Sequence, residues 1–160
     1  MKDERIKYID LLYSIYVSLK KEFKDATVSM KESGEEIKGP YFLVQIRPRT
    51  PEAYRFYDKE FVNVTITYGD VVLDQEKQLI KQDELTSLFD LGIEVNGAFI
   101  LFEDKDFSYG DGFINLNFSL NYFNEKHDRS IYLDDRYTEM LKELDMDFYI
   151  NGKEKKYGED

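Results

Sequence analysis

The sequence predicts an α+β domain, a two-layer sandwich in which a mainly antiparallel sheet carries two helices on one face. Three observations predict this fold class. Residues 113–123 alternate between apolar and polar side chains, the pattern of a strand with one buried face. Residues 4–24 and 74–90 instead repeat apolar side chains at intervals of three and four, which indicates amphipathic helices. Asn-Gly at 96–97 and Asp-Gly at 111–112 are dipeptides typical of hairpin turns between strands.

Both helices have residues suited to their ends. The first, over residues 4–24, has Asp3 as its expected N-cap and lysines in its last turns, where cations complement the helix dipole. The second starts after Asp74, another good N-cap residue, and Gly92 is expected to end it.

Four strands are expected to build the sheet. Their predicted ranges are about 41–47, 55–68, 97–108 and 112–123, and residues 27–30 are a further short candidate. The strand at 55–68 alternates like the one at 112–123, so both are expected to bury one row and expose the other. Residues 47–51 are expected to form a loop, because two prolines so close together do not fit inside a ladder of hydrogen bonds.

The remaining segments are expected to lie outside this core. The polar stretch 31–36 is expected to be an exposed loop. A shorter helix is expected over 133–146, and residues 148–160 are expected to be a C-terminal arm or small hairpin. The chain would then hold one α+β domain at 1–147, without internal repeats or a linker.

Composition excludes several classes of function. The chain lacks cysteine and has one histidine, so a disulfide framework, a thiol nucleophile and the usual zinc sites are not expected. The net charge of −11, from 22 basic and 33 acidic residues, argues against nonspecific binding to nucleic acid or anionic lipid. Neither a leader nor a bilayer-spanning apolar run is recognisable, so folding in a cytoplasm is expected.

Candidate chemical motifs fail when examined individually. A calcium loop counted from Asp104 would need glycine at its sixth position and glutamate at its twelfth, but Tyr109 and Asn115 stand there. The carboxylate pairs at 35–36 and 134–135, like His127, lie in polar segments where solvent exposure is the expected state. We therefore predict no catalytic residue, no metal site and no cofactor, and hence no enzyme.

The polar rows of the two long strands are the main candidates for a functional surface. They carry amides and hydroxyls and no charge, which suits either an ordinary solvent-facing sheet or a surface that packs on another chain or lines a cavity. Arg47 and Arg49 are either solvated or a docking point for an acidic partner. The candidate interface residues are Arg47, Arg49, Asn63, Thr65, Asn115, Asn117, Ser119 and Asn121.

The order of elements and three local sequences resemble the tail terminator, or tail completion, proteins of tailed bacteriophages. The likeness rests on Gly-Pro-Tyr-Phe-Leu-Val-Gln-Ile at 39–46, on Arg-Phe-Tyr at 55–57 followed by the strand 61–68, and on Asp-Gly-Phe-Ile at 111–114 leading into the last strand. It spans about residues 5–145. The insertion at 31–36 and the extension after residue 148 depart from the family pattern.

This resemblance implies a structural virion protein of the tail or neck, assembled in the host cytoplasm. Members form a six-fold ring on the head-proximal end of the tail tube, stop its polymerisation and present the surface that joins the head connector. The implied partners are other copies of the chain, the tube protein and, as further candidates, sheath and head–tail connector proteins. DNA would pass through without specific binding, and no membrane is involved.

Two alternatives remain open. One is another neck, head-completion or tail component of similar α+β build. The other, from a different class, is an acidic inhibitor that mimics DNA. Mimicry would require carboxylates spaced like phosphates along one face, whereas the long strands carry amides.

Overall fold

The computed structural model describes residues 5–31 and 38–125, which belong to a unit that ends at Glu125. Asp3, most of the predicted loop at 31–36, His127, the predicted helix at 133–146 and the predicted arm at 148–160 lie outside the described residues. The predicted domain boundary at residue 147 therefore stays a prediction.

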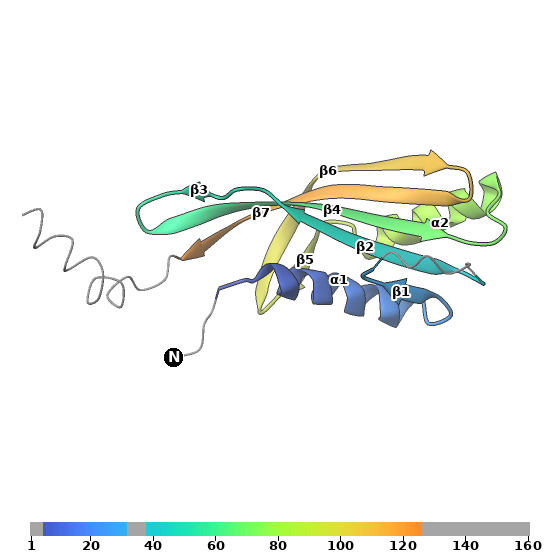
Figure 1. Ribbon diagram of the computed structural model, residues 1–160, viewed down its shortest axis with the longest axis horizontal. Helices are drawn as coiled ribbons and strands as arrows, with labels where there is room; N and C mark the ends of the chain where they lie inside the picture. Colours follow the sequence, from blue (N-terminus) through green and yellow to red (C-terminus); the bar gives the residue numbers. More distant parts are fainter. Residues whose placement is uncertain (1–4, 32–37, 126–160) are drawn as a thin grey trace, which may run out of the picture. The chain divides into compact units, whose positions relative to one another are not determined.

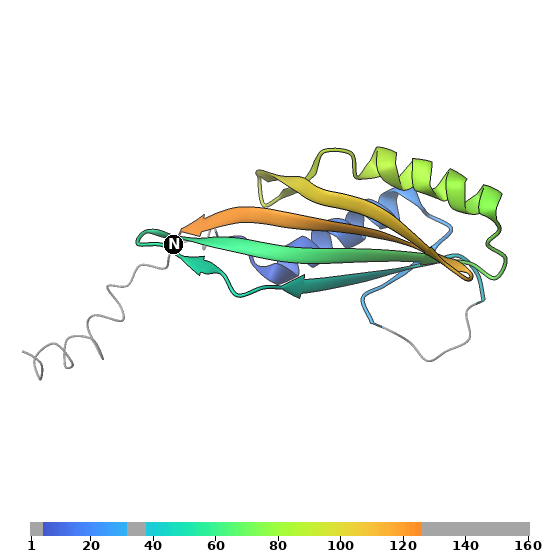
Figure 2. The ribbon, with the colours of Figure 1, turned by 90° about the horizontal axis from the view of Figure 1, so that it is seen from above.

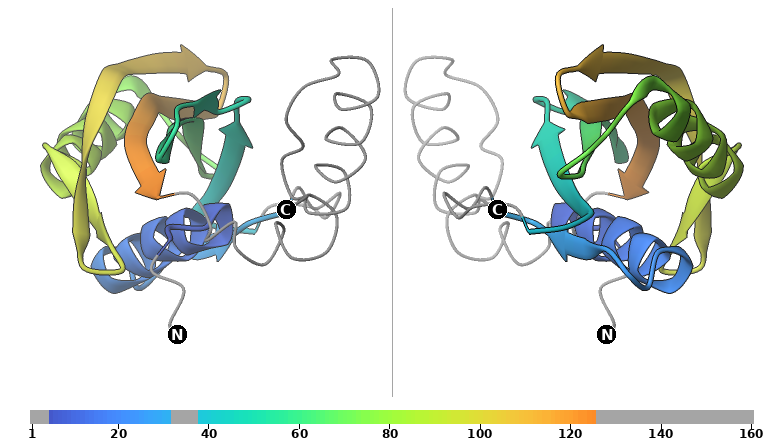
Figure 3. Two further views of the ribbon diagram at one scale, coloured as in Figure 1. Left: turned by 90° about the vertical axis from the view of Figure 1, so that its left-hand side faces the viewer. Right: turned by 90° about the vertical axis from the view of Figure 1, so that its right-hand side faces the viewer.

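The described residues form an α+β unit built on one mixed sheet (Figure 1). The strand order is β1-β2-β4-β7-β6-β5, with β3 paired to β4, and every pairing is antiparallel except that of β1 with β2. The elements are α1 (Tyr8–Glu22), β1 (Thr27–Ser29), β2 (Tyr41–Pro48), β3 (Glu52–Ala53), β4 (Tyr57–Gly69), α2 (Gln75–Leu88), β5 (Gly92–Val95), β6 (Ala98–Gly110) and β7 (Phe113–Glu125). The α+β class is confirmed, and the two-layer sandwich stays a prediction because the sheet is strongly curled (Figure 3).

The sheet curls around the core, and α1 lies along its concave side (Figure 3). Leu11, Ile15 and Leu19 of α1 are fully buried, as the spacing of three and four predicts for a helix that buries one face. The helix contacts β1 and β2 on one side and β5 on the other, so it bridges the two edges of the curled sheet.

Helix α2 lies beside β6 and β7, at the end away from β3 (Figure 2). It buries Leu85 and the adjoining cap residue Phe89. The Phe89 ring lies 6.0 Å, centroid to centroid, from the ring of Phe118 on β7, so α2 packs on the same core as α1.

Strands β4 and β7 form the centre of the sheet, paired in register from Tyr57↔Glu125 to Gly69↔Phe113. Over residues 62–68 and 114–122 their inward side chains are all buried, which confirms the predicted alternation in both strands. Each fully buried aliphatic or aromatic side chain stabilises the fold by roughly 1.5–3 kcal/mol. The inward rows are Val62, Val64, Ile66 and Tyr68 on β4, and Ile114, Leu116, Phe118, Leu120 and Tyr122 on β7.

The start of α1 differs from the prediction. The helix begins at Tyr8 and its N-cap is Lys7, so the prediction of a start near residue 4 with Asp3 as N-cap was wrong. The carboxylate of Asp10 accepts the Lys7 N–H at 2.9 Å and thereby occupies a donor that would otherwise lack a partner at the helix start. For α2 the prediction is confirmed, because Asp74 accepts the Lys77 N–H at 2.9 Å.

The end of α2 also required a correction. The helix ends at Leu88 with Phe89 as its C-cap, and Gly92 begins strand β5 instead of ending the helix. A Cβ at position 92 would lie 2.2 Å from the carbonyl oxygen of Ile100, so the glycine is needed for a close approach between strands. The ammonium of Lys105 donates to the carbonyl oxygens of Phe89 and Asp90, at 2.7 and 2.9 Å, and so places a cation just beyond the C-terminus of α2.

The predicted loop at 47–51 is in part a strand. Arg47 and Pro48 belong to β2 and pair with Asn63 and Val62 of β4. The Arg49 N–H donates to the Phe61 carbonyl at 2.8 Å, so by alternation the missing N–H of Pro48 would point away from β4. There β1 has already ended, because it pairs only with residues 41–43, and an open edge tolerates proline.

Both predicted hairpin turns are confirmed. Asn96 and Gly97 have φ of 51° and 83°, the left-handed values that a tight turn between β5 and β6 requires. Gly112, with φ of 79°, joins β6 to β7. The four-residue strand β5, which the sequence did not predict, pairs through the first of these turns.

Candidate assembly surface

The outer face of the sheet is the side that alternates with the core. On β4 and β7 it carries the predicted polar rows, and these side chains are all half-buried rather than fully exposed. The antiparallel register places each residue directly opposite a polar partner. The opposed pairs are Asn63↔Ser119, Thr65↔Asn117 and Thr67↔Asn115, and Asn121 follows opposite Phe61.

Hydrogen bonds join these polar side chains across the two strands. Thr65 Oγ1 donates to Asn117 Oδ1 at 2.9 Å, and Thr67 Oγ1 donates to Asn115 Oδ1 at 2.7 Å. Further along, Ser119 Oγ donates to Asn63 Oδ1 at 3.1 Å. The three bonds form a regular ladder, so the outer face is a fixed array rather than a set of freely moving side chains.

The ladder uses the amide oxygens and leaves the amide nitrogens available. Within the described residues, the Nδ2 groups of Asn63, Asn115 and Asn117 make no hydrogen bond. An amide nitrogen carries two donors that seek water or an acceptor on a partner. The outer face therefore presents neutral donors to whatever it meets.

Charge on the outer face changes from one edge to the other. The register places Arg47 of β2, Asn63, Ser119 and Glu103 of β6 in one row across the sheet. The next row runs from Gln45 through Thr65 and Asn117 to Asp106. In these two rows the face is thus basic or neutral on β2, neutral on β4 and β7, and acidic on β6.

The predicted interface residues lie on this face or beside it. Arg47 is exposed at the end of β2, opposite Asn63, so the structure brings it next to the amide row. Arg49 is exposed immediately after β2. Asn121 donates through Nδ2 to the carboxylate of Glu103, a partner that the sequence did not predict.

Sequence reasoning also missed a group of exposed aromatic rings at the β3–β4 hairpin and the adjoining end of β7. Phe56 is 71% exposed and Phe123 is 61% exposed. The ring of Tyr57 stacks on Tyr54 at 4.9 Å and meets the edge of Phe123 at 5.1 Å. Aromatic residues crowded at 54–57, where neither predicted helix reaches, were the signal in the sequence.

A second missed group lies on the inner face near the same end. Glu60 is buried and accepts a hydrogen bond from the Tyr8 hydroxyl at 2.7 Å, and Tyr122 of β7 lies directly opposite Glu60. Burial, together with the hydrogen bond and charge of Glu60, raises the pKa of Tyr8 to about 12. Burial and the charge of Glu60 also raise the pKa of Tyr122. Both tyrosines therefore stay neutral beside the glutamate.

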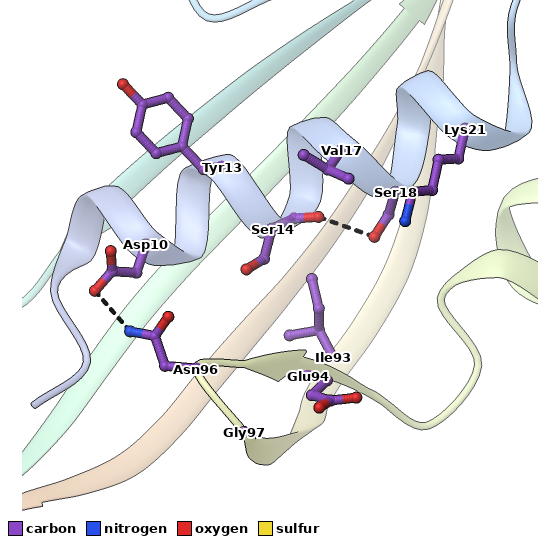
Figure 4. A pocket seen from close by; sticks show the side chains of 10 residues that line it. All are labelled: Asp10, Tyr13, Ser14, Val17, Ser18, Lys21, Ile93, Glu94, Asn96 and Gly97. Atoms are coloured by element: carbon purple, nitrogen blue, oxygen red, sulfur yellow. Dashed lines mark hydrogen bonds between the residues drawn. The ribbon is translucent and has the colours of Figure 1, made fainter. Parts of the chain in front are cut away.

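An open groove of about 540 Å³ lies between α1 and β5 (Figure 4). Its polar groups serve the fold: Asp10 accepts from Asn96 Nδ2 at 3.0 Å as well as from Lys7, and Ser18 Oγ donates to the Ser14 carbonyl at 2.9 Å. The groove lacks an arrangement of nucleophile, base and orienting group among these lining residues.

The charged stretch that begins at Asp104, where a calcium loop would start, lies at an irregularity of β6. The register with β7 shifts between Glu103 and Asp106, and Asp104 has a positive φ of 52°. In the part of the chain that the structure describes, no group of three or more His, Cys, Asp or Glu is placed to hold a metal ion.

Comparison with known families decides the kind of protein. The model of a family described as phage tail terminator protein matches residues 10–131, well over half of the chain. The chain belongs to the phage tail terminator family. The matched range includes most of α1, all of α2 and every strand of the described sheet. No curated protein matches the chain.

Family membership confirms the resemblance read from the sequence and makes this terminator a structural component of phage tails. It does not test the eight candidate interface residues, which stay predictions. Within residues 5–31 and 38–125, no helix is long and apolar enough to span a membrane.

Proposed function

We propose that this terminator forms a ring of identical subunits on the head-proximal end of the tail tube, ends tube polymerisation and provides the attachment surface for the head connector. Membership of the tail terminator family is the observation that carries the proposal. The partners are then other copies of the chain, the tube protein and the connector, with a sheath protein as a further candidate. The activity is assembly, and it requires no bond to be made or broken.

The outer face suits the wall of a channel that DNA crosses. Its centre, on β4 and β7, is a hydrogen-bonded array of neutral side chains. Retention of DNA needs cations that neutralise phosphates, and the whole chain carries a net charge of −11. A ring that turned this face inward would let DNA pass without holding it.

Termination would be steric. One side of the ring would match the last ring of the tube, and the other side would offer no surface on which a further tube subunit could bind. The fold supports such a role because its central strands are long and paired over their whole length, which gives the subunit a continuous hydrogen-bonded frame.

The first experiment removes the protein from assembling phage. Particles made without it should contain tubes of variable, excessive length and tails without heads, and the wild-type gene supplied in trans should restore uniform tails. Labelled protein should be seen at the head-proximal tail end by electron microscopy. Normal tails without the protein would contradict the proposal, and label at the head vertex alone would indicate a neck component.

A second experiment tests the channel wall. Asn115→Lys and Asn117→Lys together place cations on the outer face, so DNA release from assembled particles should be slower and more sensitive to salt. Glu76→Lys with Asp83→Lys, both exposed on α2, makes a larger change of charge elsewhere and should leave release unchanged. Equal release from both variants would exclude the outer face as the channel wall.

A further inference from the structure

We propose that neighbouring copies bind head to tail, with a basic aromatic edge of one copy on an acidic edge of the next. The inference rests on the proposed ring and specifies the two surfaces that close it. The basic edge comprises Arg47, Arg49, Tyr54, Arg55, Phe56, Tyr57, Lys59 and Phe123. The acidic edge comprises Asp90, Leu91, Glu94, Phe99, Leu101, Glu103, Asp104 and Asp106.

The basic edge reverses the charge of the rest of the chain. Residues 47–59 contain four basic side chains and two acidic ones, a local charge of +2 in a protein of net charge −11. Aromatic rings lie beside these cations, and the guanidinium of Arg55 lies 5.0 Å from the ring centre of Phe56. Exposed aromatic and arginine side chains are the residues most enriched at the centres of protein interfaces.

The acidic edge has the opposite character. Residues 90–106 contain five acidic side chains and one basic one, a local charge of −4, and the single cation, Lys105, binds the carbonyls at the end of α2. Apolar side chains lie among the acids: Phe99 is 60% exposed, Leu101 is 58% exposed, and Glu94 is directly opposite Phe99. This edge therefore offers both charge and apolar area to a partner.

The topology places most of the basic edge and the acidic edge on opposite sides of the sheet, while Lys59 of β4 and Phe123 of β7 lie opposite each other between them. Strands β2 and β3 lie on one side of β4, whereas β6 and β5 lie beyond β7 on the other (Figure 2). A two-fold contact would set like charges against each other at either edge. A head-to-tail contact pairs opposite charges instead, and it generates a ring when the rotation between neighbours closes.

A second copy is the occupant that these charges favour. Copies of a chain with net charge −11 repel each other unless a local basic surface meets an acidic one, and this chain contains both. Each copy then uses both edges once, so every subunit in the ring is equivalent.

Charge reversal tests the pairing directly. One variant carries Arg49→Glu and Arg55→Glu, and the other carries Glu94→Lys and Asp106→Lys, all at exposed positions. Each variant alone would set like charges against each other, and we expect at least a tenfold loss of association. A 1:1 mixture should assemble again, because the reversed basic edge of one variant complements the reversed acidic edge of the other.

The experiment uses the full chain, alone and with purified tail tubes that lack the terminator. Sedimentation velocity measures the oligomer, and negative-stain images show rings. Two matched controls make the same changes of charge elsewhere. One is Lys20→Glu with Lys24→Glu, on and just after α1, and the other is Glu76→Lys with Asp83→Lys on α2. Both should assemble as wild type. Recovery in the mixture also shows that both variants are folded.

The outcomes separate this inference from the proposed function. If wild type and both reversal variants form the same rings, the ring stands and the two edges are wrong. If a variant forms normal rings but no longer binds tubes, that edge faces the tube and the head-to-tail contact is overturned. If wild type forms no ring either alone or on tubes, the proposed ring itself fails, and the edges with it.

Discussion

The two faces of the central strands differ in what holds their side chains. On the inner face, β4 and β7 bury apolar residues against α1 and α2, and Val62, Ile66, Leu116 and Leu120 are fully buried. On the outer face, the same strands carry half-buried polar residues that bond to each other across the strands. Because successive side chains point to opposite faces, the same two strands can bury apolar residues that stabilise the fold and present a polar surface for recognition.

This difference has an energetic consequence. Apolar burial is roughly proportional to area and depends on close packing, so loss of a core side chain leaves a cavity. A cross-strand hydrogen bond on a half-exposed face exchanges with bonds to water, so its loss costs little. The outer face can therefore change for recognition without unfolding the subunit.

The largest expected effect comes from the inner face. Leu116→Ala removes a fully buried side chain next to β4 and should lower the free energy of unfolding by about 2–5 kcal/mol. Its neighbour on the outer face, Asn117→Ala, should cost about 1 kcal/mol or less. Urea denaturation followed by circular dichroism measures both free energies of unfolding. Equal losses in the two variants would contradict the view that the inner face stabilises the fold more than the outer face.

An intermediate effect is expected at the buried polar group of the inner face. Tyr8→Phe removes the hydrogen bond to Glu60 and should cost about 1–2 kcal/mol at neutral pH, near the lower end for a charge-assisted bond because Tyr8 is 38% exposed. Tyr13→Phe, on the exposed side of the same helix, is the matched control. A cost for Tyr8→Phe no larger than that of the control would show that the bond is unimportant.

The stability of the protein at alkaline pH tests the same hydrogen-bonded pair, Tyr8 and Glu60. The pKa of Tyr8 is about 12 in the folded protein and about 10 in an unfolded chain, so the folded state holds this proton more tightly. Its contribution to stability is full below about pH 10 and is lost as the pH rises towards 12. Tyr8→Phe should flatten this decline without abolishing it, because the pKa of Tyr122 is raised as well. If stability declined with the same slope in Tyr8→Phe as in wild type, Tyr8 would not be a cause of the decline.

The smallest expected effect is the coupling within the outer ladder. Thr67→Val and Asn115→Ala each remove one partner of a 2.7 Å hydrogen bond. A double-mutant cycle should give a coupling energy of about 0.5–1 kcal/mol, typical of cross-strand polar pairs. The same cycle on Thr67 and Asn117, which lie in different rows, is the control and should give a coupling near zero. Equal coupling in the two cycles would show that the ladder is not built from separate pairs.

Sequence reasoning succeeded where the signal was local. The alternation at 62–68 and 114–122 identified the buried rows of β4 and β7 because the period of a strand is two, whatever it pairs with. Asp74 and the turns at 96–97 and 111–112 were found because caps and tight turns depend on the residues that form them.

The errors arose where a distant segment decided the outcome. Pro48 lies in a strand because β1 ends before reaching it, and Gly92 begins a strand because Ile100 approaches its backbone. Lys105 lies within the strand predicted at 97–108, and its sequence position gave no sign that its ammonium would donate to the carbonyl oxygens just after α2. Each of these partners lies outside the few residues that form a cap or a tight turn, although Gly92 and Ile100 are only a short hairpin apart.

For the same reason, only part of the candidate surface could be predicted from the sequence. The amide row was visible as alternate residues of two strands, and Arg47 and Arg49 as a local basic pair. The aromatic rings beside the basic edge, and the acidic edge itself, become surfaces only when the strand order is known.

By itself, the sequence of this terminator determined the fold class, the long strands, their buried rows and the family. The tertiary structure decided which strands are neighbours, which polar groups bond to each other and which charges lie at opposite edges. The physical reason is that periodicity, caps and turns arise from interactions over a few residues. Pairing across a sheet instead joins residues some fifty positions apart, such as Thr65 and Asn117, and only the folded chain brings them together.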